Sequence, residues 1–192
     1  MKTVTFKLES RTPLLMNKFS FGKKADQISV GDLDALNDTT RTKAIAEEGA
    51  YRNAEGHLII PTDNLYRALI TAGKKVKKGK SNFSTVVSAA VQVPSDILLT
   101  DASGNPITEF ITDIRRGKNP STRGSVPIIR PRVDKWSASL TLIYDEAAIK
   151  ETDLLQIVEA LGLQVGFLDF RPEKLGSYGQ FNVMATAAAA TV

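Results

Sequence analysis

The chain has 192 residues, no cysteine and a formal net charge of +4 at pH 7. This length and an ordinary apolar content predict one domain over 1–192, and the lack of cysteine excludes disulfides and thiolate metal sites. No stretch reaches the roughly eighteen apolar residues of a membrane helix, and the first residues lack the apolar run of a signal peptide, so we expect a soluble, cytoplasmic protein with no membrane partner.

In the first half of the chain, alternating apolar residues predict a strand over 2–8. Residues 22–38 are rich in Gly, Asp, Ser and Lys, which predicts an exposed loop. A short helix is expected near 40–48 and a small hairpin over 51–60. The clearest helix runs over 62–76, where Thr62 is the expected N-cap.

In the second half, residues 82–93 fit neither the helical nor the strand period. A short strand is expected at 97–99 and a further strand over 107–114. Residues 115–127 lack apolar periodicity and predict an exposed basic loop, or the tip of a protruding hairpin. One long or bent strand over 128–144, a helix over 152–162 and a last strand over 180–186 complete the prediction.

Taken together, the strongest elements follow the order βαββαβ, with 107–114 and 134–144 as the middle strands. This order predicts the α+β class and a ferredoxin-like (RRM-like) core, with insertions at about 10–60 and 77–130. Both helices would cover one face of the sheet and leave the other face open to a ligand or partner.

Basic residues concentrate in two clusters, which predict a polyanionic partner, although such runs also occur as solvated faces. The first cluster consists of Lys74, Lys75, Lys77, Lys78 and Lys80. The second consists of Arg115, Arg116, Lys118, Arg123, Arg130, Arg132 and Lys135, opposed in sequence by Asp134.

The stretch 165–183 carries glycines at 166, 176 and 179 together with Arg171 and Tyr178. Glycine permits close backbone approach, so this spacing predicts a loop against which something packs tightly. A polyanion is one candidate for that partner. The alternative is a simple connection between the last helix and strand, with Arg171 paired to a nearby carboxylate.

Two segments resemble the RAMP superfamily, the ferredoxin-like RNA-binding subunits of CRISPR effector complexes in antiviral defence. They are LIIPTDNLYRALITAGKKVK (58–77) and the glycine-rich GFLDFRPEKLGSYGQFNV (166–183). The layout is also similar to small RAMP-like proteins of phages and prophages. The resemblance implies a homo-oligomer, or a ribonucleoprotein subunit, stacked along one RNA strand. It also implies a hairpin at 115–127 that inserts between nucleotides, and a strand-facing Arg171.

The expected function is therefore non-catalytic binding of single-stranded nucleic acid, RNA or DNA, without a metal or cofactor. The expected contacts are Lys74, Lys75, Lys77, Lys78, Arg115, Arg116, Lys118, Arg123, Arg130, Arg132, Arg171, Gly176, Tyr178 and Gly179. Candidate stacking rings are Phe19, Phe21, Trp136, Phe170 and Tyr178. Each has the alternative of a core position, which is the commoner role of large rings, and alternation with Leu140 and Leu142 assigns Trp136 to the core.

Two alternatives stay open at this point. Several RAMP proteins are metal-independent ribonucleases that use histidine, and this chain has a single histidine, His57. A structural or assembly protein of a phage or prophage is the other alternative, because the apolar 13–21 segment and the 22–38 loop could dock on a neighbouring copy.

Overall fold

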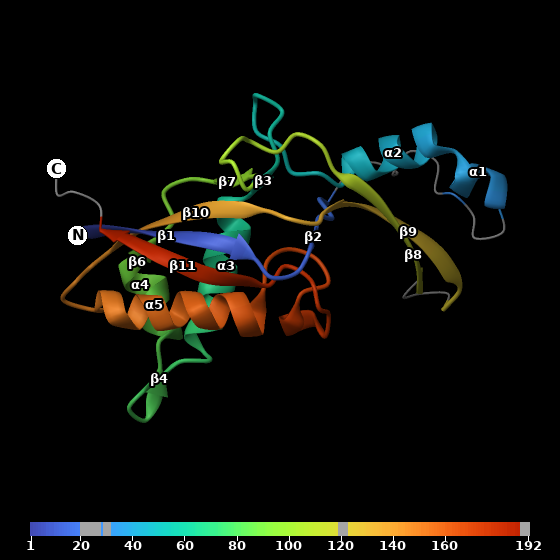
Figure 1. The fold of residues 1–192 in the computed structure, drawn as a ribbon. Coiled ribbons are helices and arrows are strands. Elements are labelled where there is room, and N and C mark those ends of the chain that lie inside the picture. Colours follow the sequence, from blue (N-terminus) through green and yellow to red (C-terminus); the bar gives the residue numbers. More distant parts are fainter. Residues whose placement is uncertain (20–27, 29–31, 119–122, 189–192) are drawn as a thin grey trace.

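The computed structural model describes residues 1–19, 28, 32–118 and 123–188 (Figure 1). The protein is mixed α and β, and every strand pairing is antiparallel. A large sheet with helices on one face forms the body of the molecule. A smaller sheet with two short helices extends from one end of it.

The large sheet has the strand order β11-β1-β10-β7-β3, and β6 also pairs with β10. Its strands are β1 (Lys2–Ser10), β3 (Ile59–Ile60), β6 (Val91–Gln92), β7 (Ile97–Thr100), β10 (Ser137–Tyr144) and β11 (Phe181–Ala188). The alternation expected for 2–8 is present, because Val4, Phe6 and Leu8 are buried while their neighbours point the other way.

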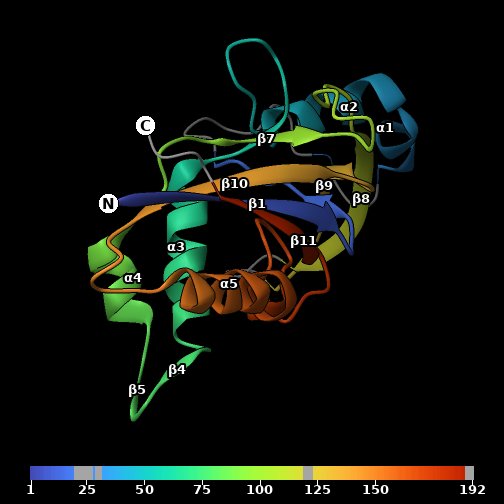
Figure 2. The same ribbon diagram turned by 60° about the vertical axis from the view of Figure 1, so that its left-hand side comes forward.

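Helices α3 (Thr62–Gly73), α4 (Ser84–Ala90) and α5 (Glu151–Ala160) lie on one side of this sheet (Figure 2). A π-helical turn, Leu161–Val165, continues α5. Beneath the sheet, the rings of Phe167 and Phe181 stack at 4.7 Å between centroids, and Trp136 packs edge-on against Phe181 at 6.0 Å. Trp136 is buried, which confirms its assignment to the core.

The other face of the large sheet is polar along β1 and β10. Thr5 and Thr141 lie opposite one another, and their hydroxyls are 3.0 Å apart. Lys7 and Ser139 form the next pair along and are both exposed. Hydroxyls and a lysine offer no ring surface for a base, so these two strands do not supply a stacking platform.

The small sheet has the order β2-β9-β8, from β2 (Leu14–Leu15), β9 (Ser125–Val133) and β8 (Ile111–Lys118). Helices α1 (Leu33–Asn37) and α2 (Thr39–Glu48) pack on it, and Ile45 and Ala46 form a second apolar cluster with Ile129. The expected hairpin at 115–127 is thus the end of a long antiparallel arm, most of which is regular strand.

A two-stranded hairpin, β4 (Lys77–Lys78) and β5 (Ser81–Asn82), leaves the body between α3 and α4. The remaining short element is the 3₁₀ turn η2 (Pro172–Lys174). The small hairpin expected at 51–60 is present, with a bridge between Arg52 and Leu58. The expected helix near 40–48 is α2.

The prediction of a middle strand over 107–114 was wrong. The central sheet instead uses β7, which lies inside the range assigned to an insertion, and β8 belongs to the small sheet. The long strand expected over 128–144 is two strands, because the chain passes from one sheet to the other at 134–136.

Several helix boundaries also differ from the prediction. Helix α3 ends at Gly73, where the carbonyl accepts a hydrogen bond from Phe83 N at 2.9 Å. Thr62 lies inside this helix rather than at its cap, and its backbone N–H donates to the Asp96 carboxylate at 2.8 Å. The loop expected over 22–38 contains α1, capped by Asp32; residues 20–27 and 29–31 lie outside the described part.

Arg52 ties α2 to the 51–60 hairpin, and its hydrogen bonds to Glu47 lower the pKa of that carboxyl. A lowered pKa adds stability above the ordinary glutamate range, and this stability is lost as the pH falls from about 5 to below 4. We expect Glu47→Gln to reduce the acid sensitivity of unfolding, measured by urea titration at several pH values. Glu47 is half exposed, so solvent screening keeps the effect below about 1 kcal/mol.

Glu48→Gln is the matched control, since Glu48 makes no ion pair within the described ranges. An acid profile that Glu47→Gln leaves unchanged would contradict the prediction.

Candidate nucleic-acid interface

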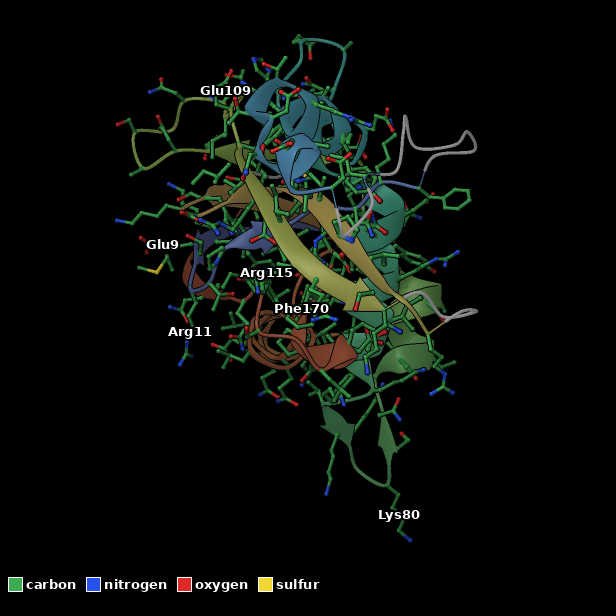
Figure 3. All side chains as sticks on the ribbon, turned by 90° about the vertical axis from the view of Figure 1, so that its right-hand side faces the viewer. Glu9, Arg11, Lys80, Glu109, Arg115 and Phe170 are labelled. Carbon is green, nitrogen blue, oxygen red and sulfur yellow. The ribbon has the colours of Figure 1, made fainter. Side chains whose placement is uncertain are left out.

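The two basic clusters lie at different ends of the molecule. The first forms the β4–β5 hairpin and the residues that lead into it; we call Lys74, Lys75, Lys77, Lys78 and Lys80 the lysine hairpin. Lys80 stands at its tip, far from Arg115 (Figure 3). All five lysines are exposed, and none forms an ion pair with any residue that the structure describes. Their charge is therefore open to a polyanion.

The second cluster is largely neutralised where β8 and β9 pair. Asp113 is 4% exposed and lies within 2.9 Å of Arg115, 3.5 Å of Arg130 and 3.4 Å of Arg132. Two further carboxylates complete the group, since Asp169 pairs with Arg130 at 2.7 Å and Asp134 with Arg132 at 2.6 Å. We call these three arginines and three aspartates the ionic cluster.

Within the ionic cluster the arginines differ in their access to solvent. Arg130 is only 6% exposed, and its Nε has no hydrogen-bond partner in the described part of the protein. Its guanidinium therefore holds the arm to the 165–180 region rather than facing a ligand. The Arg132 side chain keeps about a quarter of its surface, and its hydrogen bond to Asp134 raises its pKa.

Arg115 connects the arm to two aromatic rings, and its side chain is 39% exposed. Its guanidinium lies 4.9 Å from the centre of the Tyr178 ring and also donates a hydrogen bond to the Tyr178 hydroxyl. Tyr178 in turn packs against Phe170, with 5.9 Å between the ring centres. The hydrogen bond to Asp113 raises the pKa of Arg115, which stays cationic.

We call Arg115, Tyr178 and Phe170 the aromatic stack. Phe170 is its outer member and is 42% exposed. Arg115 and Phe170 lie close together on the face shown in Figure 3. A cation beside an exposed ring is the combination that single-stranded nucleic acids require, because phosphates meet the charge and a base meets the ring.

The glycines of 165–183 pack against the protein's own backbone. A Cβ at Gly179 would lie 2.8 Å from Phe167 N and closer still to its carbonyl, and a Cβ at Gly176 would overlap the Phe170 carbonyl. Gly179 also has φ +70° and donates to the Pro13 carbonyl at 2.8 Å. The tight approach expected at these glycines is therefore internal, and it shapes the loop that carries Phe170 and Tyr178.

Arg171 makes the local pairing that was the alternative to a ligand contact. Its Nε and Nη2 donate to Glu173 at 2.9 and 2.6 Å, and its Nη1 donates to the Leu168 carbonyl at 2.7 Å.

Toward the end of the arm, Arg116, Lys118 and Arg123 are exposed. Arg116 makes a 2.7 Å hydrogen bond to the Ser125 hydroxyl, and Arg123 has a left-handed backbone, φ 59°. Residues 119–122, at the predicted tip, lie outside the described residues. Of the remaining stacking candidates Phe19 is exposed, and Phe21 lies outside the described part.

A polar pocket of about 190 Å³ adjoins the 165–183 loop. The sequence did not predict it. Its lining residues are Asn17, Tyr51, Asn64, Leu168, Asp169 and Arg171. They come from four separate parts of the chain, so no local sequence signal could have indicated the pocket. Only Arg171 was among the expected site residues.

His57, the residue of the nuclease alternative, follows the 53–56 turn, where its backbone N–H donates to the Asn53 side chain at 2.8 Å. Within the described ranges, no three His, Asp or Glu side chains are grouped to hold a metal ion. No helix in those ranges is long and apolar enough to cross a membrane. Comparison with protein-family models found no match, and comparison with curated proteins found none either.

Proposed function

We propose that this protein binds single-stranded nucleic acid, with RNA as the first candidate, and does so without catalysis. The observation that carries the proposal is the aromatic stack, in which a half-exposed Phe170 and Tyr178 adjoin the cationic Arg115. A base would stack on Phe170 while neighbouring phosphates meet Arg115 and the exposed cations Arg116, Lys118 and Arg123 of the arm.

We further propose that the core is of the ferredoxin-like kind. The connection from β1 to β7 passes through the edge strand β3 and then α3, and β10 lies between β1 and β7 in the sheet. The crossover through α5 joins β10 to β11, and β1 lies between them. Two such split βαβ units are the defining feature of the βαββαβ arrangement, which supports the resemblance to RAMP proteins.

In this proposal the lysine hairpin is a second phosphate-binding element. Lys80, at the tip of this hairpin, lies well away from Arg115 and Phe170 of the aromatic stack (Figure 3). A single strand that touches both elements would follow the side of the molecule, and copies placed along one strand would need a contact between unlike surfaces. The proposed assembly is thus a homo-oligomer on the strand.

The test uses a fluorescent single-stranded oligonucleotide and four proteins: the wild type, Phe170→Ala, Arg115→Ala and Leu163→Ala. We expect Phe170→Ala to weaken binding about 5- to 150-fold, the range for loss of one base–ring stack of about 1–3 kcal/mol. Arg115→Ala should weaken binding and reduce its salt dependence. Leu163 is the matched control, because it is apolar and 43% exposed, and its replacement should leave affinity unchanged.

For the wild type, neutralisation of about four phosphates predicts a slope near −3 for log K against log salt. No binding at low salt, or a slope near zero, would overturn the proposal. Equal weakening of binding by Phe170→Ala and Leu163→Ala would show that the aromatic stack is not the binding interface. Single-stranded RNA and DNA oligonucleotides of the same sequence, measured side by side, determine which of the two is preferred.

A further inference from the structure

The polar pocket beside the 165–183 loop has the volume of a site for one small group. Its volume of about 190 Å³ equals that of roughly six waters at ~30 Å³ each, well below the ~300–1,000 Å³ of drug-sized sites. Asn64 projects from the first turn of α3 and Tyr51 from the start of the 51–60 hairpin. Neither the Asn64 amide nor the Tyr51 hydroxyl has a hydrogen-bond partner among the residues that the structure describes.

The charges in the pocket argue against a phosphate. Asp169 lines it, and Arg171 is already paired with Glu173. An anion would therefore meet one carboxylate directly and a second one behind the guanidinium, at a substantial electrostatic cost. A neutral group that carries both hydrogen-bond donors and acceptors suits this mixture better.

The hydrogen-bonding capacity left over has a definite pattern. The Asp169 carboxylate accepts from Arg130 and from Phe170 N, and each oxygen keeps a free lone pair. Arg171 uses three of its five N–H donors on Glu173 and Leu168, so two remain. The pocket thus offers an acceptor-only group, a donor-only group, and the amide of Asn64, which does both.

The backbone places this pocket directly beside the aromatic stack. Asp169 lies between Leu168 and Phe170, which have φ values of 57° and 50°. Such left-handed conformations are costly for residues other than glycine, and they persist here because the loop packs on Gly176 and Gly179. Consecutive residues therefore contribute Asp169 to the pocket and Phe170 to the stack.

We propose that the pocket receives a single nucleobase, guanine, from the strand that stacks on Phe170. Guanine presents N–H donors on its Watson–Crick edge, which suit Asp169, and the acceptors O6 and N7, which suit an arginine. This inference rests on the proposed function and adds a sequence preference to it: binding is tightest where a guanine neighbours the stacked base.

The test compares oligouridine with the same oligomer carrying one central guanosine, adenosine or cytidine. We expect wild-type protein to bind the guanosine oligomer about tenfold tighter than oligouridine, within the range for one well-formed base contact. Asn64→Ala should reduce that preference several-fold and leave the affinity for oligouridine unchanged. Asn182→Ala, at an exposed asparagine on β11, is the matched control and should change neither.

Asp169→Asn tests the acceptor in the pocket and should weaken guanosine binding selectively. Because Asp169 also pairs with Arg130, the folding of the Asp169→Asn variant is checked by thermal unfolding. If that variant is unfolded, Asn64→Ala alone tests the guanosine preference. Equal affinity for all four oligomers, a preference for cytidine or adenosine, or a guanosine preference that survives Asn64→Ala overturns the inference while the proposed function stands. Failure to bind any oligomer overturns both.

Discussion

Replacing Asp113 with alanine is expected to lower the free energy of unfolding by about 3–5 kcal/mol, the usual cost of removing one member of a buried ion pair. Asp113 is almost fully buried and lies within 3.5 Å of Arg115, Arg130 and Arg132. Among the described residues, the buried Arg130 would then retain only Asp169 as a counter-charge, and its Nε already has no hydrogen-bond partner there. Urea unfolding followed by far-UV circular dichroism measures the loss.

Asp134→Ala is the control for this prediction. Asp134 contacts the same Arg132 at 2.6 Å, but its side chain is 45% exposed, so its removal should cost less than about 1 kcal/mol. Similar losses in the two variants would show that the burial of Asp113 between the strands of the arm has no special importance.

The second large effect is expected at Gly179, where alanine should lower stability by about 2–5 kcal/mol. Two costs add: the left-handed φ of +70°, and the overlap between the new Cβ and the Phe167 backbone. Because the atoms that the new Cβ would meet belong to the Phe167 backbone, the overlap cannot be relieved by turning a flexible side chain. Thermal unfolding of purified protein gives the measurement.

Gly104→Ala separates these two costs. Gly104 has φ +85° in a surface turn, with no atom within 4 Å of the position its Cβ would occupy. It should therefore lose only the conformational part, about 1–2 kcal/mol. A Gly179 variant no less stable than the Gly104 variant would mean that the loop yields to the added methyl group.

Elements whose burial follows a simple period were predictable from the sequence. The strand at 2–8, the helix that begins near 62 and the core position of Trp136 all follow from apolar residues at regular spacing. The basic hairpin at 115–127 was also predictable, because its turn residues and charges interrupt the apolar periodicity.

The strand β8 was assigned to the wrong sheet because the residue on its buried face is not apolar, so the apolar alternation does not mark that face. The buried position on β8 is Asp113 and its partner on β9 is Arg130, so the hydrophobic pattern marks the wrong residues. The polar pocket was invisible for another reason: Asn17, Tyr51, Asn64 and Arg171 meet only after the chain has folded. Charge counting also overstated the second basic cluster. It began at Arg115 and omitted Asp113, which lies two residues earlier, and Asp169 is 39 residues from its partner Arg130.

The position of β1 in the sheet has a consequence for the order of folding during synthesis. Residues 2–10 are translated long before the two strands that flank them, β10 and β11, at 137–144 and 181–188. The strand must therefore wait for most of the chain to be translated before either edge is paired. During that interval its apolar residues Val4, Phe6 and Leu8 have no flanking strand to cover them, which makes the incomplete chain prone to aggregation.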